Sequence, residues 1–168
     1  MSEAYLLIGG NLGDRELNLE QSRIIINKSC GRIKLQSKIY ETAAWGSIPQ
    51  PDYLNQVLLI ETDLDPYELM RALLKTELEL GRVRNEKFGA RTIDIDILYF
   101  DDTIIDADEL TIPHPRISER RFVLTPLAEI AEEMTDPKNR KNIKTMLLEC
   151  KDELSVSEFS PNVHKNDL

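Results

Sequence analysis

The chain has 168 residues, of which 41% are hydrophobic and 30% charged, a composition that fits an ordinary globular protein and excludes fibrous and low-complexity proteins. Its formal net charge of −9 at pH 7 argues against general nucleic-acid binding, because such a surface repels phosphate backbones. Cys30 and Cys150 have no CxxC spacing, and no apolar run reaches membrane-spanning length. We therefore expect a cytoplasmic protein with reduced thiols and no membrane partner.

The first half of the chain predicts strands alternating with helices. Residues 5–8 are an apolar run that stops at a Gly-Gly pair, which predicts a strand. Residues 14–28 predict a helix that is capped by Asp14 and has apolar residues at helical spacing, including Leu17 and Ile24. Residues 33–40 and 53–62 predict two more strands, separated by a long loop that carries Trp45.

The second half continues this alternation. Asp65, followed by a proline and a glutamate, predicts the start of a helix that ends at Gly81. The apolar stripe of that helix consists of Leu69, Leu73 and Leu80. Residues 92–100 predict a strand, and residues 124–134 predict a further helix.

The order of these elements, strand, helix, strand, strand, helix, strand, predicts the fold class. It is the βαββαβ order of an α+β, ferredoxin-like domain with a mainly antiparallel sheet. We expect the helices to pack on one face of the sheet and the other face to stay available for a ligand. Residues 1–150 are expected to form a single domain, and the polar residues 151–168 a weakly ordered tail.

The residues with the clearest chemical signal are 81–98, which read GRVRNEKFGARTIDIDIL. Four cations against one acid in residues 82–91 predict an anion site in an acidic chain. Asp94 and Asp96 follow on the predicted strand, where residues two apart share a face and lie roughly 7 Å apart. Such a pair can hold Mg²⁺ and leave coordination positions open for water and phosphate.

The Asp-Ile-Asp spacing taken alone is more often a solvated strand face. Here the opposite face carries Ile93, Ile95 and Ile97, so the aspartate face must be wet or liganded. A second cluster places His114 between two prolines and close to several arginines, which suits phosphate binding.

Four motifs in this order carry a resemblance to a known family. They are Ile8-Gly9-Gly10-Asn11-Leu12-Gly13, Gln50-Pro51-Asp52-Tyr53-Leu54-Asn55, residues 87–98, and Pro113-His114-Pro115-Arg116 through Phe122. Together they resemble 6-hydroxymethyl-7,8-dihydropterin pyrophosphokinase, an enzyme of folate biosynthesis. The resemblance covers most of the chain and implies transfer of diphosphate from ATP to a pterin alcohol, with AMP as the other product.

The resemblance also implies roles for individual residues. Asp94 and Asp96 would bind two Mg²⁺ ions, and Arg82 and Arg91 would hold the phosphates of the co-substrate ATP. The expected ATP-site residues are Glu77, Arg82, Arg84, Phe88, Arg91, Ile97, Thr111, His114 and Arg120. The expected pterin-site residues are Thr42, Ala43, Ala44, Trp45, Tyr53, Asn55 and Phe122, and two of these, Tyr53 and Phe122, would sandwich the pterin ring.

Two positions depart from the family pattern. Phe88 stands where many members have tryptophan, and Ala90 where many have proline. We expect these changes to alter the packing and stiffness of the loop rather than the chemistry, which needs no protein nucleophile. The protein is expected to be a monomer.

Two other functions fit part of the pattern. A different Mg²⁺-dependent nucleotidyl transferase or phosphohydrolase would explain the aspartates and arginines, but not Tyr53 with Asn55. A non-enzymatic ferredoxin-like ligand-binding module would fit the fold, since this fold serves many purposes.

Overall fold

The computed structural model describes residues 1–44, 49–81 and 92–160. In chain order its elements are β1 (Ser2–Gly10), α1 (Arg15–Ser29), β2 (Arg32–Gln36), β3 (Tyr40–Thr42), β4 (Tyr53–Thr62), α2 (Pro66–Glu79), β5 (Asp94–Phe100), β6 (Ile105–Asp106), β7 (Thr111–Ile112), the 3₁₀ turn η1 (Ile117–Glu119), α3 (Arg121–Ala131), α4 (Ile143–Glu149) and β8 (Val156–Glu158). Among these elements no helix is long and apolar enough to cross a membrane.

The strands of the main sheet lie in the order β5-β1-β4-β3-β8, and β2 also pairs with β4. All the pairs in this sheet are antiparallel. β1 and β4 take the central positions because their side chains are buried along most of their length. With α1 between β1 and β2 and α2 between β4 and β5, the topology confirms the expected α+β, ferredoxin-like arrangement.

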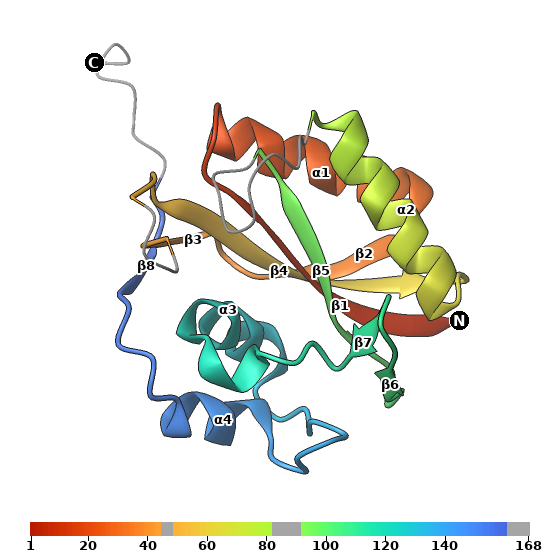
Figure 1. Cartoon of the computed structure of the whole chain (residues 1–168), viewed down its shortest axis with the longest axis vertical. Coiled ribbons are helices and arrows are strands. Elements are labelled where there is room, and N and C mark those ends of the chain that lie inside the picture. The colour runs from red at the N-terminus through yellow and green to blue at the C-terminus, as the bar shows by residue number, and fades with distance from the viewer. Residues whose placement is uncertain (45–48, 82–91, 161–168) are drawn as a thin grey trace.

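Helices cover both faces of the sheet, which corrects the expectation of one open face. Figure 1 shows α1 and α2 on one side and α3 and α4 on the other. The reason is visible in β1, where Leu6 and Ile8 belong to the core under α1 and α2, and Leu7 between them belongs to a second core with α3 and α4. Successive strand residues point to opposite faces, so a strand that is apolar at every position needs two covering layers.

The first helix begins as predicted but buries a different stripe. The Asp14 side chain accepts a hydrogen bond from Leu17 N at 3.1 Å and caps α1. The predicted contact residues Leu17 and Ile24 are 44% and 60% exposed, whereas Leu19 and Ile26 are buried. Several helical stripes of this segment contain apolar residues, and packing against the sheet decides which one faces the core.

The second helix follows its predicted boundaries. Asp65 and Glu68 form a capping box, in which each side chain accepts from the backbone N–H of the other residue. Gly81, which follows the helix, has a φ of +84°, a left-handed conformation that glycine adopts without steric cost. Leu69 and Leu73 are buried as predicted.

The predicted strand over residues 33–40 is divided into β2 and β3. Between them the Ser37 side chain accepts a hydrogen bond from Val57 N at 3.0 Å, and Ser37 N donates to Val57 O at 2.9 Å. Ser37 therefore stays hydrogen-bonded to β4 where the strand pairing changes register. The alternation of polar and apolar residues does not reveal this break between β2 and β3.

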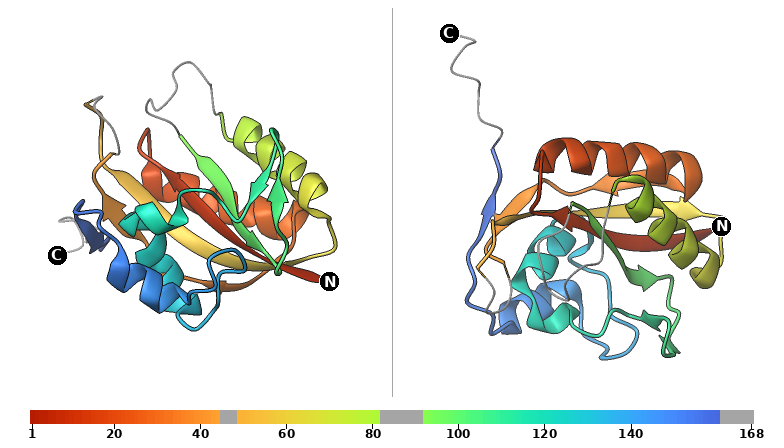
Figure 2. Two further views of the ribbon diagram at one scale, coloured as in Figure 1. Left: turned by 60° about the horizontal axis from the view of Figure 1, so that its bottom comes forward. Right: turned by 45° about the horizontal axis from the view of Figure 1, so that its top comes forward.

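The end of the chain contains two elements that the sequence did not predict. The last predicted helix, residues 124–134, is α3 and starts earlier, at Arg121, and α4 follows it with Asn142 as its N-cap. Residues 151–160, expected to belong to a weakly ordered tail, include β8, which pairs with β3 (Figure 2). A short edge strand uses mainly backbone groups, so it needs no marked periodicity.

Candidate active site

Three strands bring Asp94 and the expected pterin residue Asn55 into one row, with Asp96 on the same face. Asp94 on β5 is paired with Gly9 on β1, and Gly9 is also paired with Asn55 on β4. In the next row Asp96 is paired with Leu7, whose side chain belongs to the core with α3 and α4. Directly paired residues point to the same face, so Asp94, Asp96 and Asn55 all face the α3 and α4 side. Asp94 and Asn55 are two strand spacings apart, roughly 10 Å.

Gly9 makes this row possible because it has no side chain. A Cβ at Gly9 would lie 2.3 Å from Asn55 Oδ1 and 2.9 Å from Leu54 O. The amide of Asn55 therefore occupies the space above Gly9, while its Nδ2 donates to Thr42 Oγ1 at 3.0 Å. Asn55 is buried with its amide held in one orientation, as a group that reads the edge of a ligand should be.

The two aspartates fit the donor set that Mg²⁺ requires. Ile95 and Ile97 are buried on the α1 and α2 side of β5, and the alternating Asp94 and Asp96 are half-buried on the other. Within residues 1–44, 49–81 and 92–160 no group of three or more His, Cys, Asp or Glu side chains could hold a metal. Mg²⁺ commonly binds through one or two carboxylates and completes its shell with water and phosphate oxygens, so two aspartates suffice for it.

A buried carboxylate from α2 holds the strand between the aspartates. Glu77 is 3% exposed, and its Oε2 accepts a hydrogen bond from Ile95 N at 2.7 Å. Ile95 stands between Asp94 and Asp96, so this bond sets the path of the backbone that carries both carboxylates. Glu77 thus acts on the site from the face opposite the ligand.

His114 and Arg120 provide donors near the aspartates. Burial, together with the charge of Arg120, lowers the pKa of His114 to about 4, although Asp94 acts in the opposite direction. His114 is therefore neutral at pH 7, and its Nδ1 accepts from Arg116 N at 3.3 Å. This bond assigns the ring proton to Nε2, which can donate to a phosphate oxygen.

The guanidinium of Arg120 is also influenced by the charges of Asp94 and Asp96. Burial and the charge of Arg116 lower its pKa, and Asp96 and Asp94 oppose that change. The guanidinium carbon lies 5.6 Å from the centre of the Phe122 ring. Arg120 therefore packs against the first turn of α3 within range of the charges of both aspartates.

The two expected stacking aromatics come from different layers. Tyr53 is half-buried at the start of β4, where it is paired with Thr42 of β3 on the same face as Asn55. Phe122 is half-buried in the first turn of α3 and packs against the core beneath that helix. Both residues belong to the α3 and α4 side of the sheet, as a stacking pair requires.

The remaining predicted residues divide into two groups. Ala43 and Ala44 are half-buried just after β3, and Thr111 lies in β7. The Ile97 side chain is buried on the opposite face from the aspartates, so only its backbone can meet a ligand there. The positions that lie outside the described residues are Trp45, Arg82, Arg84, Phe88, Ala90 and Arg91.

Two polar residues that contact the segment just before β4 were assigned no role from the sequence. Asn11 Nδ2 donates to Gln50 Oε1 at 3.0 Å and to Pro51 O at 2.9 Å. Arg15 NH1 donates to Glu41 Oε2 at 2.6 Å and to Asp52 O at 3.0 Å. Asn11 belongs to the first motif of the resemblance, and that membership was the one signal that could have pointed to it.

Comparisons with known proteins identify the family. Residues 5–132 match the family model for 7,8-dihydro-6-hydroxymethylpterin-pyrophosphokinase. A 2-amino-4-hydroxy-6-hydroxymethyldihydropteridine pyrophosphokinase of Bacillus subtilis is 42% identical over 132 residues, which cover 78% of this chain and 79% of the relative. The enzyme of the same name from Synechocystis is 38% identical over 161 residues, or 95% of this chain and 82% of the relative.

Solved structures confirm the fold. The wild-type HPPK-DHPS of Plasmodium falciparum has a TM-score of 0.70 at 16% identity, over 88% of this chain. This chain spans 43% of the length of that bifunctional protein. A complex of the same protein with pterin and p-hydroxybenzoate has a TM-score of 0.71, over 88% of this chain and 41% of that one.

The family model covers most of the chain, and relatives near 40% identity cover most of both sequences. These relatives are named as pyrophosphokinases of a hydroxymethyldihydropteridine, and a pyrophosphokinase transfers diphosphate from ATP to its substrate. A bifunctional relative from Pisum sativum is named for folate synthesis. It is 38% identical over 128 residues, which cover 76% of this chain and 25% of the relative. The chain therefore belongs to the 7,8-dihydro-6-hydroxymethylpterin-pyrophosphokinase family and is a pyrophosphokinase of folate biosynthesis.

Proposed function

We propose that the α3 and α4 side of the sheet binds ATP and the hydroxymethyl pterin side by side, with two Mg²⁺ ions held by Asp94 and Asp96. The observation that carries this proposal is the row from Asp94 through Gly9 to Asn55. In that row the backbones of Asp94 and Asn55 lie roughly 10 Å apart on one sheet, a separation that supports a shared role in binding metal and pterin. A triphosphate bound at the aspartates could then reach a pterin alcohol bound at the amide.

The transfer needs an acceptor oxygen in line with the leaving group. The pterin hydroxymethyl oxygen attacks the β-phosphorus of ATP, the bond from that phosphorus to the α–β bridging oxygen breaks, and AMP leaves. The hydroxyl proton passes to solvent. Mg²⁺, when bound, neutralises phosphate charge and lowers the pKa of the attacking hydroxyl.

The chain's own residues orient the phosphates and stabilise the charge that develops on them. Arg120 places a guanidinium beside the aspartates, and neutral His114 offers Nε2–H as a donor without adding charge. We assign Arg82 and Arg91 to phosphate binding, Thr111 to the ATP site, and the backbone of Ile97 to the same site. The other proposed ATP-site residues are Arg84, Phe88 and Glu77, which acts through its bond to Ile95 N.

The pterin is bound through stacking and an amide contact. Tyr53 and Phe122 sandwich the flat ring, an arrangement that contributes about 1 kcal/mol per ring pair beyond area burial. Asn55, oriented by Thr42, reads the hydrogen-bonding edge of the pterin. Ala43, Ala44 and Trp45 complete the proposed pterin site.

We place the protein in the cytoplasm as a monomer with a single pyrophosphokinase domain, which extends past the expected boundary at residue 150 because β8 pairs with β3 of the main sheet. The free and buried state of Cys30 and Cys150 fits a reducing compartment. The two core layers share the strands of one sheet, which supports a single domain.

A product assay tests the reaction. The protein is incubated with Mg²⁺, ATP and 6-hydroxymethyl-7,8-dihydropterin, and the nucleotide products are separated by chromatography. AMP release that depends on the pterin is the expected result. ADP as the product, or hydrolysis that is indifferent to the pterin, would instead favour another nucleotidyl transferase or phosphohydrolase.

Isothermal titration calorimetry tests the site. Titration of a non-hydrolysable ATP analogue should give Mg²⁺-dependent heat, and 6-hydroxymethylpterin should then bind to the resulting complex. Pterin binding that an Asn55→Ala variant leaves unchanged would contradict the assignment of the amide. Thr125→Ala, a half-buried residue further along α3, is the matched control.

A further inference from the structure

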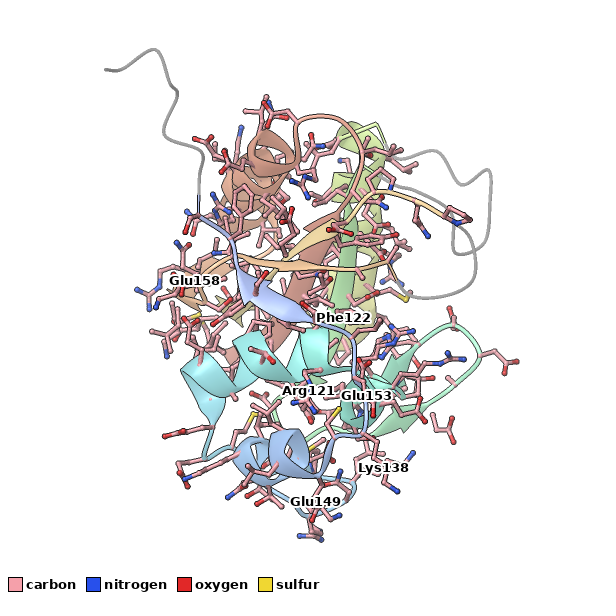
Figure 3. All side chains as sticks on the ribbon, turned by 90° about the vertical axis from the view of Figure 1, so that its left-hand side faces the viewer. Arg121, Phe122, Lys138, Glu149, Glu153 and Glu158 are labelled. Atoms are coloured by element: carbon pink, nitrogen blue, oxygen red, sulfur yellow. The ribbon has the colours of Figure 1, made fainter. Side chains whose placement is uncertain are left out.

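The segment that follows α4 contacts both walls of the proposed pterin site. We infer that Asp152 and β8 are positioning elements for that site: Asp152 holds the first turn of α3, which carries Phe122, and β8 holds β3, which carries Thr42. This inference rests on the proposed function, because it assumes that the pterin binds between these elements. Figure 3 shows Arg121 and Phe122 at the start of α3, with the blue segment that leads to β8 running past them.

Asp152 caps α3 from a distant part of the chain. The N-cap position of α3 is Arg120, which makes no side-chain capping bond. Asp152 Oδ2 accepts a hydrogen bond from Arg121 N at 3.0 Å, the role that a local Ser or Asp usually fills. The negative charge also lies at the positive end of the helix dipole.

The side chain of Arg121 reinforces this link. Its Nε donates to Asp152 O at 2.9 Å, and its NH2 donates to Cys150 O at 2.9 Å. Asp152 Oδ1 accepts from Leu154 N at 3.0 Å, so its carboxylate is bonded on both oxygens. Arg121, the residue before Phe122 and the first residue of α3, is thereby tied to the segment after α4 through both its backbone and its side chain.

β8 acts on the opposite wall. It pairs with β3 in the register Tyr40 with Glu158, Glu41 with Ser157 and Thr42 with Val156. Thr42, the residue that accepts from the Asn55 amide, is thus held between β4 and β8. Without β8, β3 would be a three-residue edge strand supported on one side only.

Phe159 extends the contact towards the start of β4. Phe159 N donates to Ile39 O at 2.8 Å, and the Arg15 guanidinium carbon lies 5.7 Å from the centre of its ring. Arg15 in turn binds Glu41 and the carbonyl of Asp52, the residue before Tyr53. The segment therefore reaches Tyr53 and Phe122 by separate routes, and loosening it should weaken pterin binding.

The test compares pterin affinity in full-length variants by calorimetry, with Mg²⁺ and a non-hydrolysable ATP analogue present. Asp152→Ala should raise the pterin Kd roughly three- to tenfold, the effect expected of a lost helix cap that fixes a binding residue. Asp152→Asn, which keeps one oxygen acceptor, should recover part of the affinity. Phe159→Ala should also raise the pterin Kd, and it should leave the Kd of the ATP analogue unchanged because it acts through β3 and Arg15.

Two controls separate positioning from general stability. Glu153→Ala removes the exposed neighbouring carboxylate and should bind pterin as the unmodified protein does. Ile26→Val destabilises the core on the other side of the sheet and should lower the melting temperature without changing the pterin Kd. If Asp152→Ala does not fold, Asp152→Asn decides the question.

The inference is overturned if the Asp152 variants bind pterin with unchanged Kd, or if Ile26→Val weakens pterin binding as much as Asp152→Ala does. Failure of the proposed function looks different. In that case the unmodified protein itself gives no pterin heat in the presence of Mg²⁺ and the ATP analogue.

Discussion

Removal of the Glu77 carboxylate tests how the strand of the aspartates is held. In Glu77→Ala the N–H of Ile95 loses the oxygen that accepts its bond at 2.7 Å, and both residues are buried, at 3% and 7% exposure. An unsatisfied buried donor costs about 1–3 kcal/mol, and the deleted Cγ methylene adds roughly 1 kcal/mol. We therefore expect Glu77→Ala to lose about 2–4 kcal/mol of unfolding free energy.

Glu77→Gln is the matched control, because the amide keeps an oxygen that can accept from Ile95 N and nearly the same volume. It should cost about 1 kcal/mol, the difference between a charged and a neutral acceptor. Urea unfolding followed by circular dichroism measures both variants. Turnover measured against Mg²⁺ concentration should show a higher half-saturation value for Glu77→Ala, since the backbone between Asp94 and Asp96 is no longer held. The reasoning is refuted if Glu77→Ala equals the unmodified protein in both stability and Mg²⁺ dependence.

Three further variants test separate parts of the site. Asp96→Ala should abolish turnover with little change in melting temperature, because it removes one of two neighbouring carboxylates that repel each other; retained activity with a large loss of stability would contradict the metal role. Gly9→Ala should weaken pterin binding and lower the melting temperature, because its Cβ would lie 2.3 Å from Asn55 Oδ1, and unchanged calorimetric affinity would contradict this. His114 has a pKa lowered from 6.5 to about 4 in the folded state, so the unfolded state binds more protons between these values. The metal-free protein should therefore lose stability as pH falls through that window, and His114→Asn should flatten that part of the curve of unfolding midpoint against pH.

Local patterns in the sequence were sufficient for most of the elements that carry the site. The capping signals at Asp14 and Asp65 predicted where α1 and α2 begin, because a helix start depends on a few adjacent residues. The alternation around Asp94 and Asp96 predicted that both carboxylates leave the same face of a strand. These features depend on interactions between neighbours in the chain, so they can be read without the fold.

Long-range packing decided other features that local patterns did not show. The apolar residues of α1 are compatible with more than one buried stripe, and the sheet selected Leu19 and Ile26 over Leu17 and Ile24. The sequence did not predict that α3 and α4 form a second helical layer. The reason is related, because apolar residues along a strand do not identify the segment that covers each face of the sheet.

The sequence by itself determined the chemistry of this protein: two carboxylates on a strand, cations before them, and the ordered motifs that mark a pyrophosphokinase. Only the tertiary structure decided that Gly9 lets Asn55 lie in the same row as Asp94, that Asp152 caps α3, and that β8 pairs with β3. The physical reason is the distance along the chain between the residues that interact. Residue type and spacing encode neighbours along the chain, whereas strand register and distant caps arise when segments far apart in sequence bury their apolar faces together.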